Sequence, residues 1–162
     1  MRPSDPAEPR IARVIAGADA LGLSIAPVTF ENETRTAQQA ATEIGCDVAQ
    51  IVKSLVFHDD GRTFLFLVSG ANRLDPGRAA RAAETEAVDK ADAELTKKAT
   101  GFSIGGVPPF GHATELPVIV DEDLLGFDEV WAAAGRPDSV FPIDPRELAR
   151  ATGGRVAALR AG

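Results

Sequence analysis

The chain of 162 residues contains no tyrosine and only one cysteine, one tryptophan and two histidines. A single cysteine, Cys46, cannot form a disulfide within the chain. The two histidines, His58 and His112, are too few to build a metal site by themselves. No stretch approaches the roughly 20 apolar residues that a membrane span requires. We therefore expect a cytoplasmic protein that needs no metal, no cofactor and no membrane.

Positive charge is also scarce, because 17 Lys and Arg stand against 24 Asp and Glu, for a net charge of −7. This balance excludes proteins that coat nucleic acid through bulk electrostatics, since phosphate binding depends on Lys and Arg displacing counterions. Any contact with nucleic acid must be local. Candidate cations for such a contact are Lys53 and residues among Arg73, Arg78, Arg81, Lys97 and Lys98.

The composition, 44% hydrophobic and 25% charged, is that of one globular domain spanning residues 1–162. Residues 1–10 hold three prolines and no apolar run, so they predict a flexible tail. Apolar periodicity predicts helices and strands without regular βαβ alternation. We expect an α+β fold with a mixed, largely antiparallel sheet or open barrel flanked by helices. The expected helices are 10–21, 36–45, 74–85, 90–101 and 144–154, and the expected strands are 24–30, 50–58, 62–70, 116–121, 128–135, 139–143 and 155–159.

The strongest strand signal is "QIVKSLVFHDDGRTFLFLVSG", two β-rich runs joined by Asp-Asp-Gly, which is typical of a hairpin. Strict alternation turns Lys53 to the same face as Ile51 and Leu55. A lysine on an apolar face is costly unless an anionic group meets it, so Lys53 is a candidate site residue. The alternative is a lysine whose stem is buried and whose amine reaches water.

A second unusual segment is "SIGGVPPFGH", Ser103 to His112, with four glycines or prolines in six residues. Glycine lets backbone approach a partner closely and proline holds the chain still. The segment therefore predicts a rigid loop that presents backbone groups to a ligand, or else an ordinary tight connection.

Other reactive side chains carry weaker signals. Cys46 follows a predicted helix and is interpreted as a buried structural thiol. Ser54 and His112 could be combined with an acid into a triad, but no Gly-x-Ser-x-Gly elbow supports it.

Several blocks together resemble a known family in the expected order. They are "TAQQAATEIGCDVAQIVKSLVF", "FLFLVSGANRLD", "ATGFSIGGVPPFGH", "LPVIVDEDL", "VWAAAGRPDSVF" and "ELARATGGRV". The chain resembles the YbaK family of free-standing aminoacyl-tRNA deacylases, which is related to the editing domain of bacterial prolyl-tRNA synthetase. The resemblance runs from about Thr29 to Val156.

The resemblance implies roles for individual residues. Lys53 matches the lysine on which activity in the family depends, and the loop that begins at Gly105 and Gly106 matches the family's Gly-x-x-x-Pro loop, whose backbone faces the aminoacyl ester. These three are the expected catalytic residues. The substrate-binding residues it implies are Phe30, Ser54, Pro109 and His112.

The function that the resemblance implies is trans-editing, the hydrolysis of a wrongly attached small amino acid from tRNA(Pro). Cysteine-specific members carry an acid where this chain has Val140, which argues against a cysteine substrate. The implied partners are aminoacyl-tRNA and, as a candidate, prolyl-tRNA synthetase. The alternative is a non-catalytic tRNA or nucleic-acid binding module that keeps the fold without the chemistry.

Overall fold

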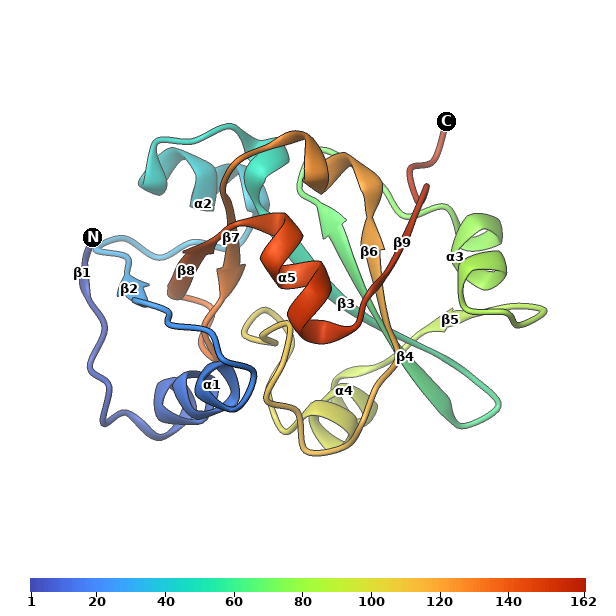
Figure 1. Cartoon of the computed structure of the whole chain (residues 1–162), viewed down its shortest axis with the longest axis horizontal. Coiled ribbons are helices and arrows are strands. Elements are labelled where there is room, and N and C mark those ends of the chain that lie inside the picture. Colours follow the sequence, from blue (N-terminus) through green and yellow to red (C-terminus); the bar gives the residue numbers. More distant parts are fainter.

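Nine short strands form two sheets, and five α-helices surround them (Figure 1). The computed structural model describes residues 1–162. One sheet has the order β1-β2-β8-β7 and the other the order β5-β3-β4-β6-β9. The expected α+β fold is confirmed. The strands are β1 (Arg2–Pro3), β2 (Val28–Thr29), β3 (Val52–Asp59), β4 (Arg62–Ser69), β5 (Asp89–Lys90), β6 (Val118–Asp121), β7 (Val130–Ala133), β8 (Ser139–Ile143) and β9 (Arg155–Ala157).

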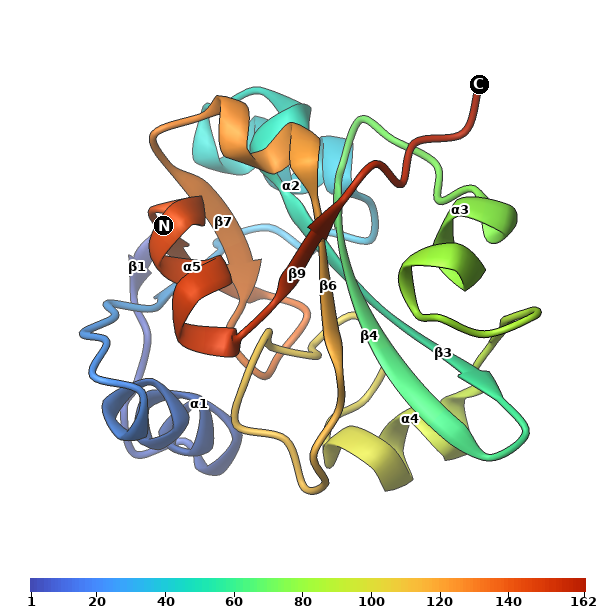
Figure 2. The same cartoon turned by 45° about the vertical axis from the view of Figure 1, so that its right-hand side comes forward.

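The five-stranded sheet is built around the predicted hairpin of β3 and β4. Asp60 and Gly61 form its turn, both with positive φ (49° and 82°), which suits the right-handed twist of the two strands. β5 pairs antiparallel with β3, whereas β6 runs parallel to β4 and β9 runs parallel to β6. Figure 2 shows β3, β4, β6 and β9 lying side by side. The sheet is therefore mixed.

The four-stranded sheet is antiparallel throughout. A single parallel bridge between Ile51 and Trp131 joins it to the start of β3. Beyond that bridge β3 has no partner on this side until Phe57 and His58 pair with β5. The two sheets thus meet at one corner and leave an open edge along β3.

Capping residues define the helix ends largely as their sequence predicts. The Thr36 hydroxyl accepts from Gln39 N at the start of α2, and the Gln39 side chain accepts from Arg35 N, so the two residues do not form a reciprocal capping box. Asp144 caps α5 with Pro145 at its first position. The helices are α1 (Pro9–Ala20), α2 (Ala37–Ile44), α3 (Pro76–Ala82), α4 (Ala93–Thr100) and α5 (Pro145–Thr152), with 3-10 turns η1 (Val48–Gln50) and η2 (Glu122–Gly126).

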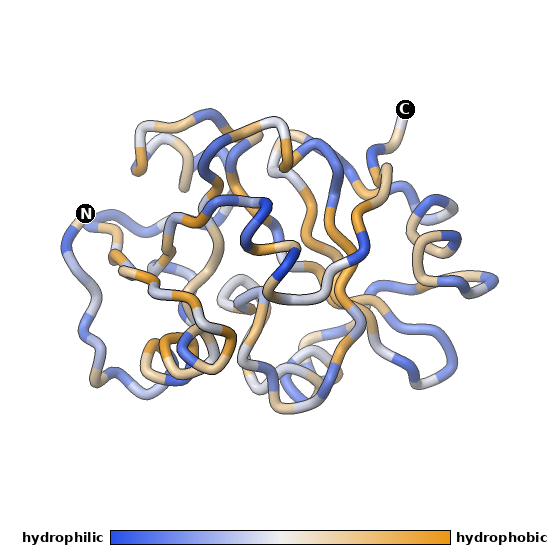
Figure 3. The backbone as a smooth tube through the Cα atoms, in the orientation of Figure 1, coloured by the Kyte–Doolittle hydropathy of each residue, from blue (hydrophilic) through white to orange (hydrophobic).

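The main core lies between the two sheets. It contains 18 buried residues, among them Leu65, Leu67 and Phe141, and α5 contributes Leu148 to it. A second cluster lies on the other face of the five-stranded sheet, where Phe66 packs under α3. Figure 3 shows the apolar residues concentrated along the central strands. Buried strands of this kind hold the pocket walls in place.

Two segments differ from their expected structure. In the predicted tail, Arg2–Pro3 pairs with β2 and α1 begins at Pro9, because the backbone of β2 offers an open edge. The expected strand 24–30 is reduced to Val28–Thr29, since Pro27 removes a backbone donor. No helix is long and apolar enough to cross a membrane.

Candidate active site

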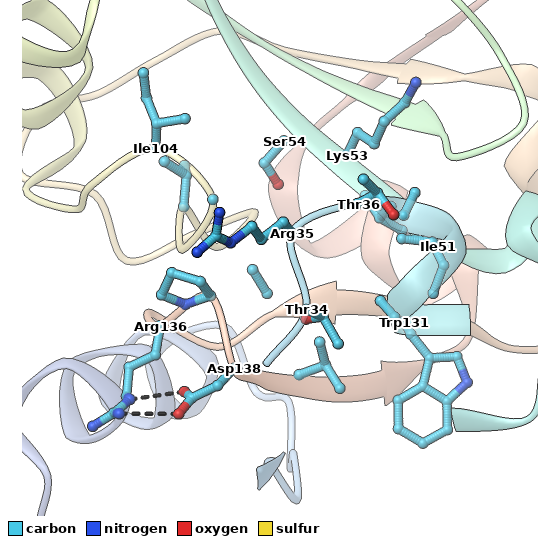
Figure 4. Close-up of a pocket in the computed structure, with 18 of the residues that line it drawn as sticks. Thr34, Arg35, Thr36, Ile51, Lys53, Ser54, Ile104, Trp131, Arg136 and Asp138 are labelled. Atoms are coloured by element: carbon cyan, nitrogen blue, oxygen red, sulfur yellow. Dashed lines mark hydrogen bonds and ion pairs between the residues drawn. The ribbon is translucent and has the colours of Figure 1, made fainter. Parts of the chain in front are cut away.

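A pocket of about 750 Å³ opens between the free edge of β3, the segment that leads into α2, and the glycine- and proline-rich segment Ser103–His112, called the Gly/Pro loop below. Four of the residues expected at the site line it, namely Phe30, Lys53, Ser54 and Gly105. They come from parts of the chain up to 75 residues apart, so the fold brings together what the sequence only suggested separately (Figure 4).

Lys53 is half-buried in β3, and its ammonium donates a hydrogen bond to the backbone carbonyl of Asn72. Burial lowers the pKa of the Lys53 amine, and the negative charge of Asp121 opposes that effect. An ammonium has three N–H groups, so two of them have no partner within the protein. These two donors are available to an anionic group of a ligand.

Ser54 follows Lys53, and its side chain leaves the opposite face of the strand. Figure 4 shows the Ser54 hydroxyl directed into the pocket and the Lys53 amine directed away from it. The Ser54 hydroxyl is buried and has no hydrogen-bond partner. A buried polar group left unpaired costs about 1–3 kcal/mol, so pairing of the Ser54 hydroxyl by a ligand would be favourable.

The backbone of Ser54 also faces this side. Gly70 N donates to Ile51 O at 2.7 Å on the β4 side, whereas Ala91 N donates to Val56 O at 3.0 Å on the β5 side. Backbone groups alternate in direction along an antiparallel strand, so the N–H and C=O of Ser54 point away from β4. No strand pairs with Ser54 on that side. The edge therefore offers one donor and one acceptor beside the pocket.

The inner wall of the pocket is apolar. Phe30, Ile51 and Val140 are buried and pack together with Ala40 of α2. Figure 4 places Trp131 at one side of the same wall. This lining suits a small, uncharged side chain.

The Gly/Pro loop is anchored by its second half, where Val107, Pro108, Pro109 and Phe110 are buried. Gly105 has a φ of +91°, a conformation that L-residues with a side chain rarely adopt. Gly106 does not line the pocket, because a Cβ there would lie 2.8 Å from the Gly135 carbonyl oxygen. Of the two glycines expected to face the ligand, only Gly105 lines this pocket.

Pro109 and His112 are not brought to this pocket. They line a second hollow of about 690 Å³ beside α1. His112 Nε2 lies 2.7 Å from the Pro108 carbonyl oxygen, and burial lowers the pKa of the imidazole. The ring thus contacts the loop on the side away from the pocket. The sequence resemblance could not show which side of the loop His112 occupies.

Three arginines at the pocket, Arg10, Arg35 and Arg136, were missed by the sequence analysis. Arg136 binds both carboxylate oxygens of Asp138, at 2.8 and 3.0 Å. Burial would raise the pKa of Asp138, but the hydrogen bonds from Arg136 and Ser139 outweigh it and lower that pKa. Only the fold reveals this cluster, because its members lie in three distant segments.

Of the cations expected to contact nucleic acid, Lys53 lines the pocket and the other five do not. Arg78 and Arg81 belong to α3, which packs on the other face of the five-stranded sheet. No three His, Cys, Asp or Glu side chains gather as a possible metal site. Cys46 lies outside the pocket, and burial raises the pKa of its thiol.

Comparison with known proteins assigns this fold and pocket to a class. A model of the aminoacyl-tRNA editing domain matches residues 31–151, and the chain belongs to that family. The resemblance inferred from the sequence motifs is confirmed.

Individual relatives agree with the assignment. The chain is 33% identical over 120 residues to the uncharacterized protein YwhH of Bacillus subtilis, covering 74% of this chain and 76% of that protein. It is 29% identical over 104 residues to the proline-tRNA ligase of Acidithiobacillus ferrooxidans, covering 64% of this chain but only 18% of the ligase. A crystal structure of a proposed trans-editing enzyme for prolyl-tRNA synthetase matches with a TM-score of 0.90 and 47% identity, covering 96% and 99% of the two chains.

Proposed function

We propose that the protein is a trans-editing hydrolase that removes a wrongly attached small amino acid from tRNA(Pro). The observation that carries the proposal is the pocket itself, which unites Lys53, Ser54, Gly105 and Phe30. Membership of the editing-domain family supports it. The tRNA is proposed from the relatives, which include proline-tRNA ligases and a proposed trans-editing enzyme for prolyl-tRNA synthetase.

The chemistry needs little machinery, because an aminoacyl-tRNA is an activated ester. A water attacks the ester carbonyl carbon, the bond to the ribose oxygen breaks, and free amino acid and tRNA are released. Such a reaction requires a positioned water and stabilisation of negative charge. Lys53, whose amine points away from the pocket in Figure 4, would supply charge to the terminal phosphate, and the backbone at Gly105 would orient the water.

The apolar wall supports a small amino acid. Phe30, Ile51 and Val140 offer contacts to a methyl or methylene group and no partner for a charged side chain. A synthetase cannot strongly reject a smaller side chain by binding alone, so a second hydrolytic site has a clear use. Two acids, Glu33 and Asp138, also line the pocket, and Arg136 occupies both oxygens of Asp138.

Residues at the mouth of the pocket support the proposal that the other half of the substrate is the end of a nucleic acid. Arg10 and Arg35 reach solvent there, with exposed side-chain fractions of 46% and 79%. The exposed Ile104 of the loop adds an apolar surface on which a base can pack. We propose that these residues hold the phosphates and terminal base of the tRNA acceptor end.

Hydrolysis and binding separate this function from a non-catalytic tRNA-binding module. The experiment measures loss of labelled amino acid from alanyl-, seryl- and cysteinyl-tRNA(Pro), with the spontaneous rate subtracted, beside binding of uncharged tRNA(Pro). Hydrolysis of at least one ester above the spontaneous rate is expected. Binding of tRNA with no acceleration for any ester would favour the module.

A further inference from the structure

Asp121, at the end of β6, is a carboxylate with no exposed surface. Its oxygens accept hydrogen bonds from Ser69 N at 3.0 Å, Asn72 Nδ2 at 2.9 Å and Asp123 N at 3.0 Å. All three donors are neutral, and no ion pair reaches Asp121. A buried charge with only neutral partners is expensive unless a cation lies near it.

Two of these bonds fix the turn that follows β4. Asp121 holds both ends of the turn, through Ser69 N and the Asn72 side chain, and Asn72 N donates to Ser69 O at 2.9 Å. The Ser69 hydroxyl ties the same turn to Ala49 O at 2.7 Å. The backbone carbonyl of Asn72 is thereby held in one direction, and it accepts the hydrogen bond from the Lys53 ammonium.

Electrostatics couples the same two residues. The positive charge of Lys53 is disfavoured by burial and favoured by the field of Asp121. The other acid beside the turn is Asp123, which accepts from Asn72 Nδ2 at 2.8 Å and lies 3.8 Å from Arg160. Arg160 therefore offsets the charge of Asp123, and Asp121 has no such partner.

We propose that Asp121 is a positioning residue for Lys53. It holds the Ser69–Asn72 turn so that the Asn72 carbonyl receives the ammonium, and it places a buried negative charge behind that turn. The catalytic consequence rests on the proposed function, but the link between the two side chains does not. A purely structural Asp121 would cap η2 and fix the turn without affecting the titration of Lys53.

The test is the titration of the Lys53 amine, followed by its rate of acetylation with acetic anhydride against pH in the folded protein without tRNA. Asp121→Asn keeps the shape of the side chain and removes its charge, so it should lower the pKa of Lys53. Asp123→Asn is the matched control and should shift that pKa less. An unchanged Lys53 titration in folded Asp121→Asn would overturn the electrostatic link.

A second variant tests the positioning if Asp121→Asn does not fold. Asn72→Ala keeps both charges and the carbonyl but cuts the side-chain bond to Asp121, so deacylation should fall about tenfold while the Lys53 titration changes little. Full activity of folded Asn72→Ala would refute the positioning role. Failure of wild-type deacylation would refute the proposed function instead, because the titration is measured without substrate.

Discussion

Lys53 combines three properties that rarely coincide in one side chain: burial, a charge, and two N–H groups without a protein partner. Replacing it by alanine removes the charge and should leave the fold intact, because the stem lies at the pocket and not in the central core. We expect kcat/KM for deacylation to fall about a hundredfold, which corresponds to about 3 kcal/mol of transition-state stabilisation. Lys90→Ala, on the neighbouring strand β5, is the control and should keep wild-type activity. Wild-type turnover by Lys53→Ala would remove lysine from the mechanism.

His112 allows a prediction on stability against pH. Burial lowers its pKa in the folded protein, whereas an unfolded histidine titrates near about 6.5. As pH falls below that value the unfolded chain binds a proton that the folded chain refuses, so stability is lost between the unfolded pKa and the lower folded pKa. The loss is at most about 1.4 kcal/mol per pH unit.

The matching experiment is urea unfolding of wild type and His112→Gln between pH 7 and pH 5. His112→Gln should flatten the decline in the free energy of unfolding as the pH falls. If the free energy of unfolding of His112→Gln declines as steeply as that of wild type, the decline arises from other titrating groups.

In the Gly/Pro loop, a substitution can test the backbone conformation of a glycine separately from the space around it. Gly105 has room for a Cβ, whose nearest neighbour would be Pro137 Cγ at 3.7 Å, so Gly105→Ala is opposed only by the φ of +91°. We expect the loop to change conformation and kcat/KM to fall at least tenfold, while tRNA affinity is retained. Gly61→Ala is a matched control, since Gly61 has a φ of +82° in the β3–β4 turn, far from the pocket.

Gly61→Ala should cost about 1–2 kcal/mol of stability and no activity. Gly106→Ala should chiefly destabilise the fold, because its Cβ would meet the Gly135 backbone. Equal loss of tRNA binding and turnover in Gly105→Ala would show that the loop holds tRNA and does not shape the ester pocket.

Local signals predicted the elements well where the sequence specifies them directly. The β3–β4 hairpin followed from alternation and Asp-Asp-Gly, and α5 from Asp144 and Pro145. The short strands β1 and β5 could not be predicted, because two residues carry no periodicity and pair only where a neighbouring edge is open.

The site was predictable in part for the same reason. Lys53 and Gly105 carry local signals, an isolated charge and a glycine cluster. Arg10, Arg35 and Arg136 carry none, because they meet only through the folding of three separate segments. The position of His112 behind the loop likewise depends on packing against α1.

The whole molecule carries a net charge of −7, so the proposed tRNA contact depends on local cations, and those at the pocket are the candidates. If Lys53, Arg10, Arg35 and Arg136 neutralise three or four phosphates, the logarithm of tRNA affinity should fall with the logarithm of salt concentration at a slope of magnitude about 2 to 3. Arg35→Ala should reduce that slope by about 0.7, and Arg81→Ala, on α3, should leave it unchanged. If Arg81→Ala reduces the slope instead, the tRNA contacts the face of the sheet that α3 covers.

The most direct measurement of the central claim compares two esters of the same tRNA. Single-turnover hydrolysis of alanyl-tRNA(Pro) and prolyl-tRNA(Pro) by the wild-type protein isolates the amino acid as the only difference. We predict that the alanyl ester is hydrolysed at least about tenfold faster, the size of effect that one or two methylene groups produce in an apolar pocket. Equal rates for the two esters, or faster loss of proline, would contradict an editing function for this pocket.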